Sequence, residues 1–186
     1  MKVLLISGSR NPEGQTARAA QALLAGAKKA GAELDLLYLP ELAIERCRQC
    51  EANGWGDCRA IGDCVIEDDL DSVLAAMRGA DLLAFATPVY YGTLSESIRA
   101  CLDRVRRVCT HEDGRVGIRG KPAVGVCVAG GGGGGSYSCA VDLERVLTSI
   151  GLDVLAIQPA RRQNLDASCE MLELLGAWAV RQGKEA

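Results

Sequence analysis

Five short apolar runs alternate along this chain with five helical patterns, and this alternation constrains the fold more than any other feature. The apolar runs cover residues 2–7, 34–39, 81–87, 123–129 and 154–158. The helical patterns cover residues 16–30, 68–79, 95–108, 138–150 and 167–181. The runs show no clean polar alternation, which is typical of strands buried on both faces of a parallel sheet. The sequence therefore predicts a three-layer α/β fold with a five-stranded parallel sheet between two layers of helices.

Right-handed crossovers between parallel strands favour the flavodoxin-like strand order 2-1-3-4-5. In that order the chain changes direction between the first and third strands, and ligands bind beyond the carboxyl ends of these two strands. A chain of 186 residues has the usual size of one domain. We therefore expect a single flavodoxin-like domain over residues 1–186, with a cysteine-containing loop inserted at about residues 40–66.

The composition argues against several classes of partner. The formal net charge is −3, so no basic surface for nucleic acid is expected. The longest uncharged apolar stretch, residues 82–94, is interrupted by Pro88 and is too broken to span a bilayer. The amino terminus turns polar at Ser7, unlike a signal peptide. We expect a cytoplasmic protein without nucleic-acid or membrane partners, whose nine cysteines stay reduced.

The segment between the first apolar run and the first helical pattern reads SGSRNPEGQT and covers residues 7–16. Free N–H groups and the helix dipole at such a junction attract an anion, and three hydroxyl side chains and Arg10 reinforce the attraction. The segment has no lysine for a Walker loop and too few glycines for the dinucleotide fingerprint. It therefore indicates a terminal monophosphate as ligand. The alternative is an ordinary strand-to-helix turn with a Ser or Thr cap.

Two further loops follow predicted strands at the same edge of the sheet. Residues 87–94 contain Tyr90 and Tyr91, and residues 130–135 are six consecutive glycines followed closely by Tyr137. Tyrosines at strand ends suit a flat ring ligand, and glycine lets the backbone approach a ligand closely. The alternatives are tyrosines that cap the sheet or form a dimer surface, and glycines that form a mobile surface loop.

Together these segments carry a family resemblance. The pieces are Ser7-Gly8-Ser9-Arg10 with Gly14-Gln15-Thr16, Cys47-x-x-Cys50, Asp68-Asp69, Thr87-Pro88-Val89-Tyr90 and Leu102-Asp103-Arg104. Over roughly its first 140 residues the chain resembles the NAD(P)H-dependent FMN reductase and iron-sulfur flavoprotein branch of the flavodoxin-like superfamily. The resemblance implies an FMN-dependent oxidoreductase that takes hydride from NAD(P)H. It would then reduce a small acceptor, such as a quinone, a nitro or azo compound, or free flavin.

The same resemblance implies where the cofactor lies. Ser9, Arg10 and Thr16, with Asn11 nearby, would hold the flavin phosphate. The loop after the third strand would lie along the ring, and the glycine run would approach its pyrimidine side. The full set of expected cofactor-binding residues is Ser7, Ser9, Arg10, Asn11, Gln15, Thr16, Pro88, Val89, Tyr90, Tyr91, Gly92, Gly130, Gly131 and Gly135.

No catalytic side chain is expected, because a flavin carries the chemistry and the protein positions it. The single histidine, His111, lies in a polar segment without a supporting serine motif, which argues against a hydrolase. Three alternatives to a reductase stay open. The protein could be an FMN electron carrier, a carrier that also holds a [4Fe-4S] cluster, or a redox-sensing module that uses Cys47 and Cys50. By resemblance we expect a homodimer or homotetramer.

Four cysteines cluster as Cys47-x2-Cys50-x7-Cys58-x5-Cys64. Four thiolates in one loop could bind a [4Fe-4S] cluster or zinc. Iron-sulfur flavoproteins place the third cysteine with two residues between it and the second, where this chain has Asn53. The segment is therefore open to three interpretations, which are a structural loop, an iron-sulfur site, and a zinc or redox site.

The remaining expectations concern residues outside these loops. Cys101, Cys127, Cys139 and Cys169 are expected to pack as small hydrophobic residues. Trp55 is expected to plug the cysteine loop. Asp103 and Arg104 are expected to form an ion pair near the sheet end. Three arginines, Arg104, Arg106 and Arg107, are expected either on a solvated helix face or as a site for an NADPH phosphate.

Overall fold

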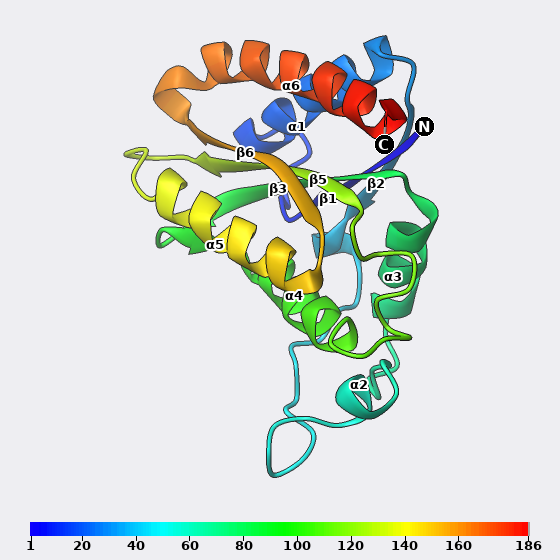
Figure 1. Cartoon of the computed structure of the whole chain (residues 1–186). Coiled ribbons are helices and arrows are strands. Elements are labelled where there is room, and N and C mark those ends of the chain that lie inside the picture. The colour runs from blue at the N-terminus through cyan, green and yellow to red at the C-terminus, as the bar shows by residue number, and fades with distance from the viewer. Residues whose placement is uncertain (186) are drawn as a thin grey trace.

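The central sheet of the protein is parallel and contains five strands within the described residues (Figure 1). The structure is a computed structural model that describes residues 1–185, and the side chains of residues 1–183. The parallel strands are Lys2–Ser7 (β1), Glu33–Tyr38 (β2), Leu82–Tyr90 (β3), Pro122–Ala129 (β5) and Asp153–Arg161 (β6). Their order is β2-β1-β3-β5-β6. This is the predicted flavodoxin-like order of five parallel strands.

A sixth strand, Thr93–Leu94 (β4), was not expected from the sequence. It pairs antiparallel with the end of β3, with Tyr90 opposite Thr93. The turn between them places Tyr91 and Gly92 at φ values of 51° and 77°. Two successive positive φ values give the tight turn that matches the twist of a hairpin. A strand of two residues is too short to leave a periodic pattern in the sequence.

Helices cover both faces of the sheet (Figure 1). Gln15–Lys29 (α1) and Leu165–Glu185 (α6) lie on one face. Leu70–Gly79 (α3), Glu96–Val108 (α4) and Ser136–Ile150 (α5) lie on the other. The shorter helical segments are Leu39–Glu41 (η1), Asp57–Ala60 (α2) and Arg162–Asn164 (η2). In the described residues the five longer helices correspond to the five predicted ones, with ends shifted by a few residues.

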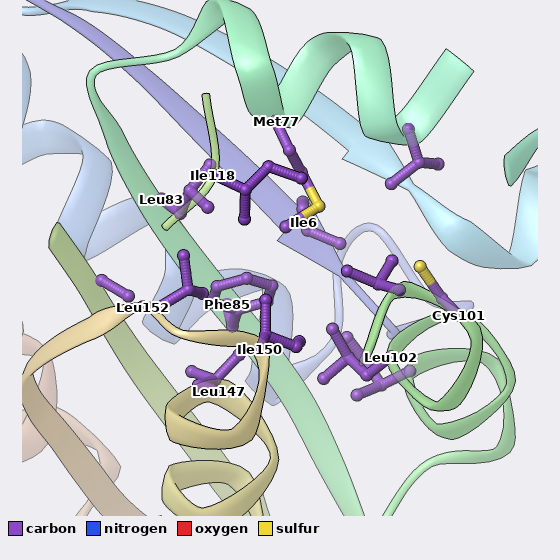
Figure 2. Close-up of a cluster of buried hydrophobic side chains, with 14 of the residues drawn as sticks. Ile6, Met77, Leu83, Phe85, Cys101, Leu102, Ile118, Leu147, Ile150 and Leu152 are labelled. Carbon is purple, nitrogen blue, oxygen red and sulfur yellow. The ribbon is translucent and has the colours of Figure 1, made fainter. Parts of the chain in front are cut away.

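Two hydrophobic layers hold this sandwich together, one on each face of the sheet. Along β1, Val3 and Leu5 belong to the layer under α1 and α6, whereas Leu4 and Ile6 belong to the opposite layer. Successive side chains of a strand point to opposite faces, so a strand covered on both sides must be apolar throughout. Figure 2 shows the second layer, where Phe85 packs among side chains from α4 and α5. The prediction of strands buried on both faces is confirmed for β1, β3 and β5, whereas the edge strands β2 and β6 are mostly half-buried.

The segment of residues 42–69 extends below α3 and α4 in Figure 1 and carries α2 near its tip. It connects the β2 end of the sheet to α3 and contains the four clustered cysteines. Among the residues that the structure describes, no helix combines the length and the apolar composition needed to cross a bilayer.

Candidate functional site

A cleft of about 610 Å³ opens at the carboxyl edge of the sheet, where β1, β3 and β5 end. A volume of this size lies within the usual range of small-molecule sites, roughly 300–1,000 Å³. The residues that line the cleft are Ser9, Asn11, Gly14, Gln15, Thr16, Pro88, Val89, Tyr90, Val128, Ala129, Gly130, Gly131, Gly132, Gly133 and Gly134. The structure thus brings together the three loops that the sequence placed at this edge.

The first wall is the loop that opens onto α1. Gly14 is the N-cap residue, and no side chain of the described residues caps the first turn. The alternative of a Ser or Thr cap is therefore wrong. The hydroxyl of Ser9 donates to the Asn11 carbonyl at 3.1 Å, and Asn11 Oδ1 accepts the Glu13 N–H at 3.0 Å. With the loop held in this way, the uncapped N–H groups at the start of α1 are available to an anion.

Gln15 supplies a second sign that a polar ligand belongs here. Its Oε1 atom is buried and has no hydrogen-bond partner among the described residues, although its side chain lines the cleft. Leaving a buried polar atom unpaired costs about 1–3 kcal/mol, so a ligand that satisfies it is favoured. Gln15 at the start of α1 therefore fits a ligand that carries a hydrogen-bond donor, such as a hydroxyl group.

The second wall is the end of β3, which extends three residues beyond the predicted strand. Pro88 lies beside Val128 of β5, whereas β1 already ends opposite Ala86. Proline cannot donate a hydrogen bond, so it is tolerated where the neighbouring strand has ended. Tyr90 follows as the last residue of β3, with a side chain that is 46% exposed. This stretch offers a rigid backbone with one aromatic side chain at its rim.

The third wall is the glycine run after β5. A Cβ atom at Gly130, Gly131, Gly132 or Gly134 would meet nothing within 4 Å, so the run borders open space on the cleft side. Gly14, Val128, Ala129 and Gly132–Gly134 were not among the expected cofactor-binding residues. For Gly132–Gly134 the sequence did contain a signal, which was the uninterrupted glycine run. A backbone without side chains can line a cleft along the whole loop and not only at its two ends.

Five expected cofactor-binding residues do not line the cleft. Ser7 is buried at the end of β1, where its Oγ accepts the Ser9 N–H at 3.3 Å. The exposed Arg10 lines a separate cavity of about 270 Å³. Tyr91 is fully exposed beyond the hairpin turn. Gly92 and Gly135 pack against each other, since a Cβ on Gly135 would lie 2.5 Å from Gly92 Cα. Their cofactor contacts stay predictions.

Arg104 differs most from its expected role. Its side chain is 1% exposed and pairs with Asp68 at 2.5 Å, whereas Asp103 is exposed on another face of α4. The expected Asp103–Arg104 pair, and a solvated or phosphate-binding role for Arg104, are therefore wrong. The helical repeat explains the error, because Arg104 lies three residues after Cys101 and four before Val108, on the buried face of α4.

The carboxylate of Asp68 is held by several donors. Besides Arg104, it accepts the N–H groups of Glu45 at 2.8 Å and Leu70 at 3.1 Å. Burial raises the pKa of Asp68, but these hydrogen bonds lower it by more, so the net pKa lies below the usual value. The ion pair ties the start of α3 and the cysteine segment to α4.

The four clustered cysteines line one narrow crevice together with Arg48, Arg104 and Arg107. Cys50 is exposed and the other three are half-buried. The crevice has about 20 Å³ of free space, enough for about one water molecule. In the described residues no three Cys, His, Asp or Glu side chains lie close enough together to hold an ion. The thiols therefore share a crevice with three arginines and two aspartates, Asp57 and Asp63, without forming a closed metal site.

The four cysteines expected to pack as small hydrophobic residues do so, although Cys169 is less buried than the other three. Cys101, Cys127 and Cys139 are fully buried, and Cys169 is half-buried in α6. Burial raises the pKa of the Cys101 thiol to about 12. Such thiols stay protonated and pack as apolar groups.

The comparison with protein families shows to which family the chain belongs. Residues 1–182 match the family model described as NADPH-dependent FMN reductase. The chain belongs to this family. The resemblance drawn from the five sequence pieces is confirmed.

Two curated relatives of this FMN reductase family member carry iron-sulfur flavoprotein names. The protein from Methanocaldococcus jannaschii is 33% identical over 131 residues, which are 70% of this chain and 62% of that protein. The protein from Methanosarcina thermophila is 35% identical over 104 residues, which are 56% of this chain and 52% of that protein. The chain therefore matches little more than half of each relative's length.

Solved structures confirm the fold of this family member. The NAD(P)H:quinone oxidoreductase from Methanothermobacter marburgensis superposes with a TM-score of 0.66 at 19% identity, covering 98% of this chain and 95% of that one. The flavodoxin, WrbA-like protein from Agrobacterium tumefaciens gives a TM-score of 0.62 at 18% identity, covering 99% and 98%. At such identities the likeness shows the flavodoxin-like fold alone.

The residues of the cleft fit FMN, the cofactor that the family implies. The uncapped start of α1 and the hydroxyls of Ser9 and Thr16 suit a phosphate. The unpaired Gln15 oxygen suits a ribityl hydroxyl, and the glycine run leaves room for a ring against β3. The cysteine crevice offers four thiols, but in the described residues no three possible ligands stand close enough together to hold an iron-sulfur group, so the sulfurs would have to move together on binding.

Proposed function

We propose that the protein is an FMN-dependent NAD(P)H oxidoreductase that reduces a small electron acceptor. The observation that carries the proposal is the cleft at the carboxyl edge, where an uncapped helix N-terminus, a rigid strand end and a glycine run meet. FMN, when bound, would accept hydride from the nicotinamide at the flavin atom N5 and would pass the electrons on to the acceptor.

The protein's own residues would hold the two ends of the cofactor differently. The N–H groups at the start of α1, with Ser9 and Thr16, would fix the phosphate through the helix dipole and direct hydrogen bonds. Pro88, Val89 and Tyr90 would provide one wall for the ring, and the backbone of the glycine run another. Fixed dipoles around the ring would orient it without a protein nucleophile.

The surroundings of the cleft support a small acceptor that enters from solvent. Tyr90 is 46% exposed and lines the cleft at its rim, where β3 enters the hairpin. Exposed aromatic side chains beside a pocket suit flat molecules such as quinones, nitro or azo compounds, and free flavin. The same exposed face is where we place contacts of a homodimer or homotetramer.

The test is anaerobic stopped-flow mixing of the FMN-loaded protein with NADPH and, separately, with NADH. We expect at least one of the two nicotinamides to bleach the absorbance of bound FMN after mixing. A quinone added afterwards should restore the absorbance. Reduction by a ferredoxin-type protein, with no response to either nicotinamide, would contradict the reductase and favour an electron carrier.

A second candidate function, an electron carrier with an iron-sulfur group, is favoured by one observation. Cys47, Cys50, Cys58 and Cys64 line a single crevice, together with three arginines and two aspartates. Thiolates and a compensating positive charge are the environment that iron-sulfur groups use. The visible spectrum of anaerobically purified protein distinguishes the two, since a pure flavin spectrum without iron removes this candidate and leaves the reductase untouched.

A further inference from the structure

The outer face of α6 carries exposed apolar side chains that the proposed function leaves unused. Met171, Leu174 and Trp178 are 53%, 73% and 37% exposed, and we call these three side chains the apolar row. Their spacing of three and then four residues places them on one face of the helix, along about two turns. The helix runs along the outside of the molecule (Figure 1). A contiguous apolar surface of this kind marks an interaction site more often than scattered exposed residues do.

The opposite face of α6 is occupied by the core, which sets the direction of the apolar row. Leu172, Ala179 and Val180 are buried in the hydrophobic layer that α6 shares with α1. A Cβ on Gly176 would collide with the carbonyl of Leu23 in α1, so the two helices cross in close contact. Residues on the other side of the helix must then point away from the sheet. The apolar row is therefore an outer surface and does not belong to the core.

The charges that flank the apolar row favour a second copy of this chain as its partner. Glu170 precedes the row and Arg181 follows it, and both are exposed. The helical repeat places the two on the same edge of α6, about three turns apart. Within the described side chains neither forms a salt bridge, whereas Asp166 and Glu173 are each paired with a cation of α1. The row thus ends in an unpaired negative charge on one side and an unpaired positive charge on the other.

This order is self-complementary about a two-fold axis that crosses α6 near Leu174. When two copies pack antiparallel about such an axis, Met171 of each faces the partner's Trp178, and a thioether packs well against an aromatic ring. The same rotation brings Glu170 of each copy to the partner's Arg181, because both charges lie on one edge of the helix. A parallel pair would set each residue beside its own copy and would leave both charges without a partner.

We propose that the outer face of α6 binds a second copy of this chain as an antiparallel helix pair. Trp, Met and Arg are the side chains that protein interfaces favour, and a two-fold contact covers the same surface on both copies. None of these residues lines the cleft, so the proposal does not depend on the oxidoreductase function. The surface is also separate from the oligomer contacts that we place at the rim of the cleft.

The first test measures the mass of the full chain by sedimentation velocity, up to the highest soluble concentration. Wild type is compared with Leu174→Asp and with the control Val116→Asp. Val116 is 65% exposed and lies outside α6, in the segment between α4 and β5. Both substitutions replace an exposed apolar side chain, so neither leaves a cavity in the core. The thermal unfolding midpoint, measured in parallel, identifies a variant that has not folded.

We expect Leu174→Asp to have half the mass of wild type, because two short carboxylates would be buried together at the two-fold axis. Val116→Asp should keep the mass of wild type. A wild type that stays a single chain at every concentration overturns the proposal, as does a folded Leu174→Asp variant with unchanged mass. Reduction of FMN by NADPH, followed in the same variants, reports on the proposed function separately.

A charge exchange tests the antiparallel arrangement. Glu170→Arg and Arg181→Glu each place like charges together at both ends of the helix pair. Each variant alone should therefore show a dissociation constant for self-association that is about tenfold higher or more. An equimolar mixture of the two should associate about as tightly as wild type, since the arginines of the first variant then face the glutamates of the second. A mixture that associates no better than its components overturns the arrangement.

Discussion

At the scale of single residues, Gly8 shows how little space the phosphate loop leaves. A Cβ at Gly8 would collide with the side chains of Ile98 and Ser95. The hydroxyls of Ser95 and Ser97 both donate to the Gly8 carbonyl, at 3.4 and 3.2 Å. The N–H of Gly8 in turn donates to the Ala86 carbonyl at 2.8 Å. A glycine between two serines thus fixes the loop to β3 and α4 at once.

We predict that Gly8→Ala lowers the free energy of unfolding by about 1–3 kcal/mol, the usual cost of overpacking a filled site. Affinity for FMN should fall with it, because the displaced loop carries Ser9. Urea unfolding and FMN titration measure the two effects. Gly79→Ala is the control, since a Cβ there meets nothing within 4 Å, and its stability should stay equal or rise by up to about 1 kcal/mol. Equal behaviour of the two variants would contradict the prediction.

At the scale of elements, the start of α5 depends on the hairpin of β3 and β4. Gly135 is the N-cap residue of α5 and has a φ of 81°. It packs closely against Gly92 in the hairpin turn. The hydroxyl of Ser138 donates to the Gly92 carbonyl at 2.7 Å. The hairpin wall and the glycine-run wall of the cleft are therefore joined through Gly92 and Gly135. Neither of these two glycines lines the cleft itself.

We predict that Gly135→Ala weakens FMN binding by about tenfold or more, equivalent to about 1.4 kcal/mol. The added Cβ would lie 2.5 Å from Gly92 Cα and push the hairpin away from the glycine run. The control is Gly151→Ala at the other end of α5, which has a φ of 96° and only ordinary side-chain contacts. It shares the backbone strain but not the hairpin contact. Calorimetric titration with FMN should show lost affinity in the first variant alone.

At the scale of the whole molecule, the cleft lies where three separate loops meet, so a ligand there would tie β1, β3 and β5 together. A ligand that binds the folded state alone, at 100 times its Kd, stabilises it by about 2.7 kcal/mol. For a chain of this size, that corresponds to a rise in Tm of about 5 to 10 °C. Binding and stability should therefore be coupled in this protein.

We predict that FMN raises the Tm by this amount and that riboflavin, which lacks the phosphate, raises it clearly less at the same concentration. The reason is the uncapped start of α1, where the phosphate would meet free N–H groups. Differential scanning fluorimetry with each ligand measures the difference. Equal shifts with both ligands would contradict a phosphate site at this helix.

The amino-acid sequence by itself determined the layers, the strand order and the three loops at the carboxyl edge, because these depend on local periodicity and on general rules of chain connection. It could not determine which side chains of those loops line the cleft, since Arg10 and Tyr91 turn away within loops that were predicted correctly. Only the tertiary structure decided that Arg104 pairs with Asp68, 36 residues earlier, and reaches Cys64. Such contacts arise from packing between elements, which no local pattern records.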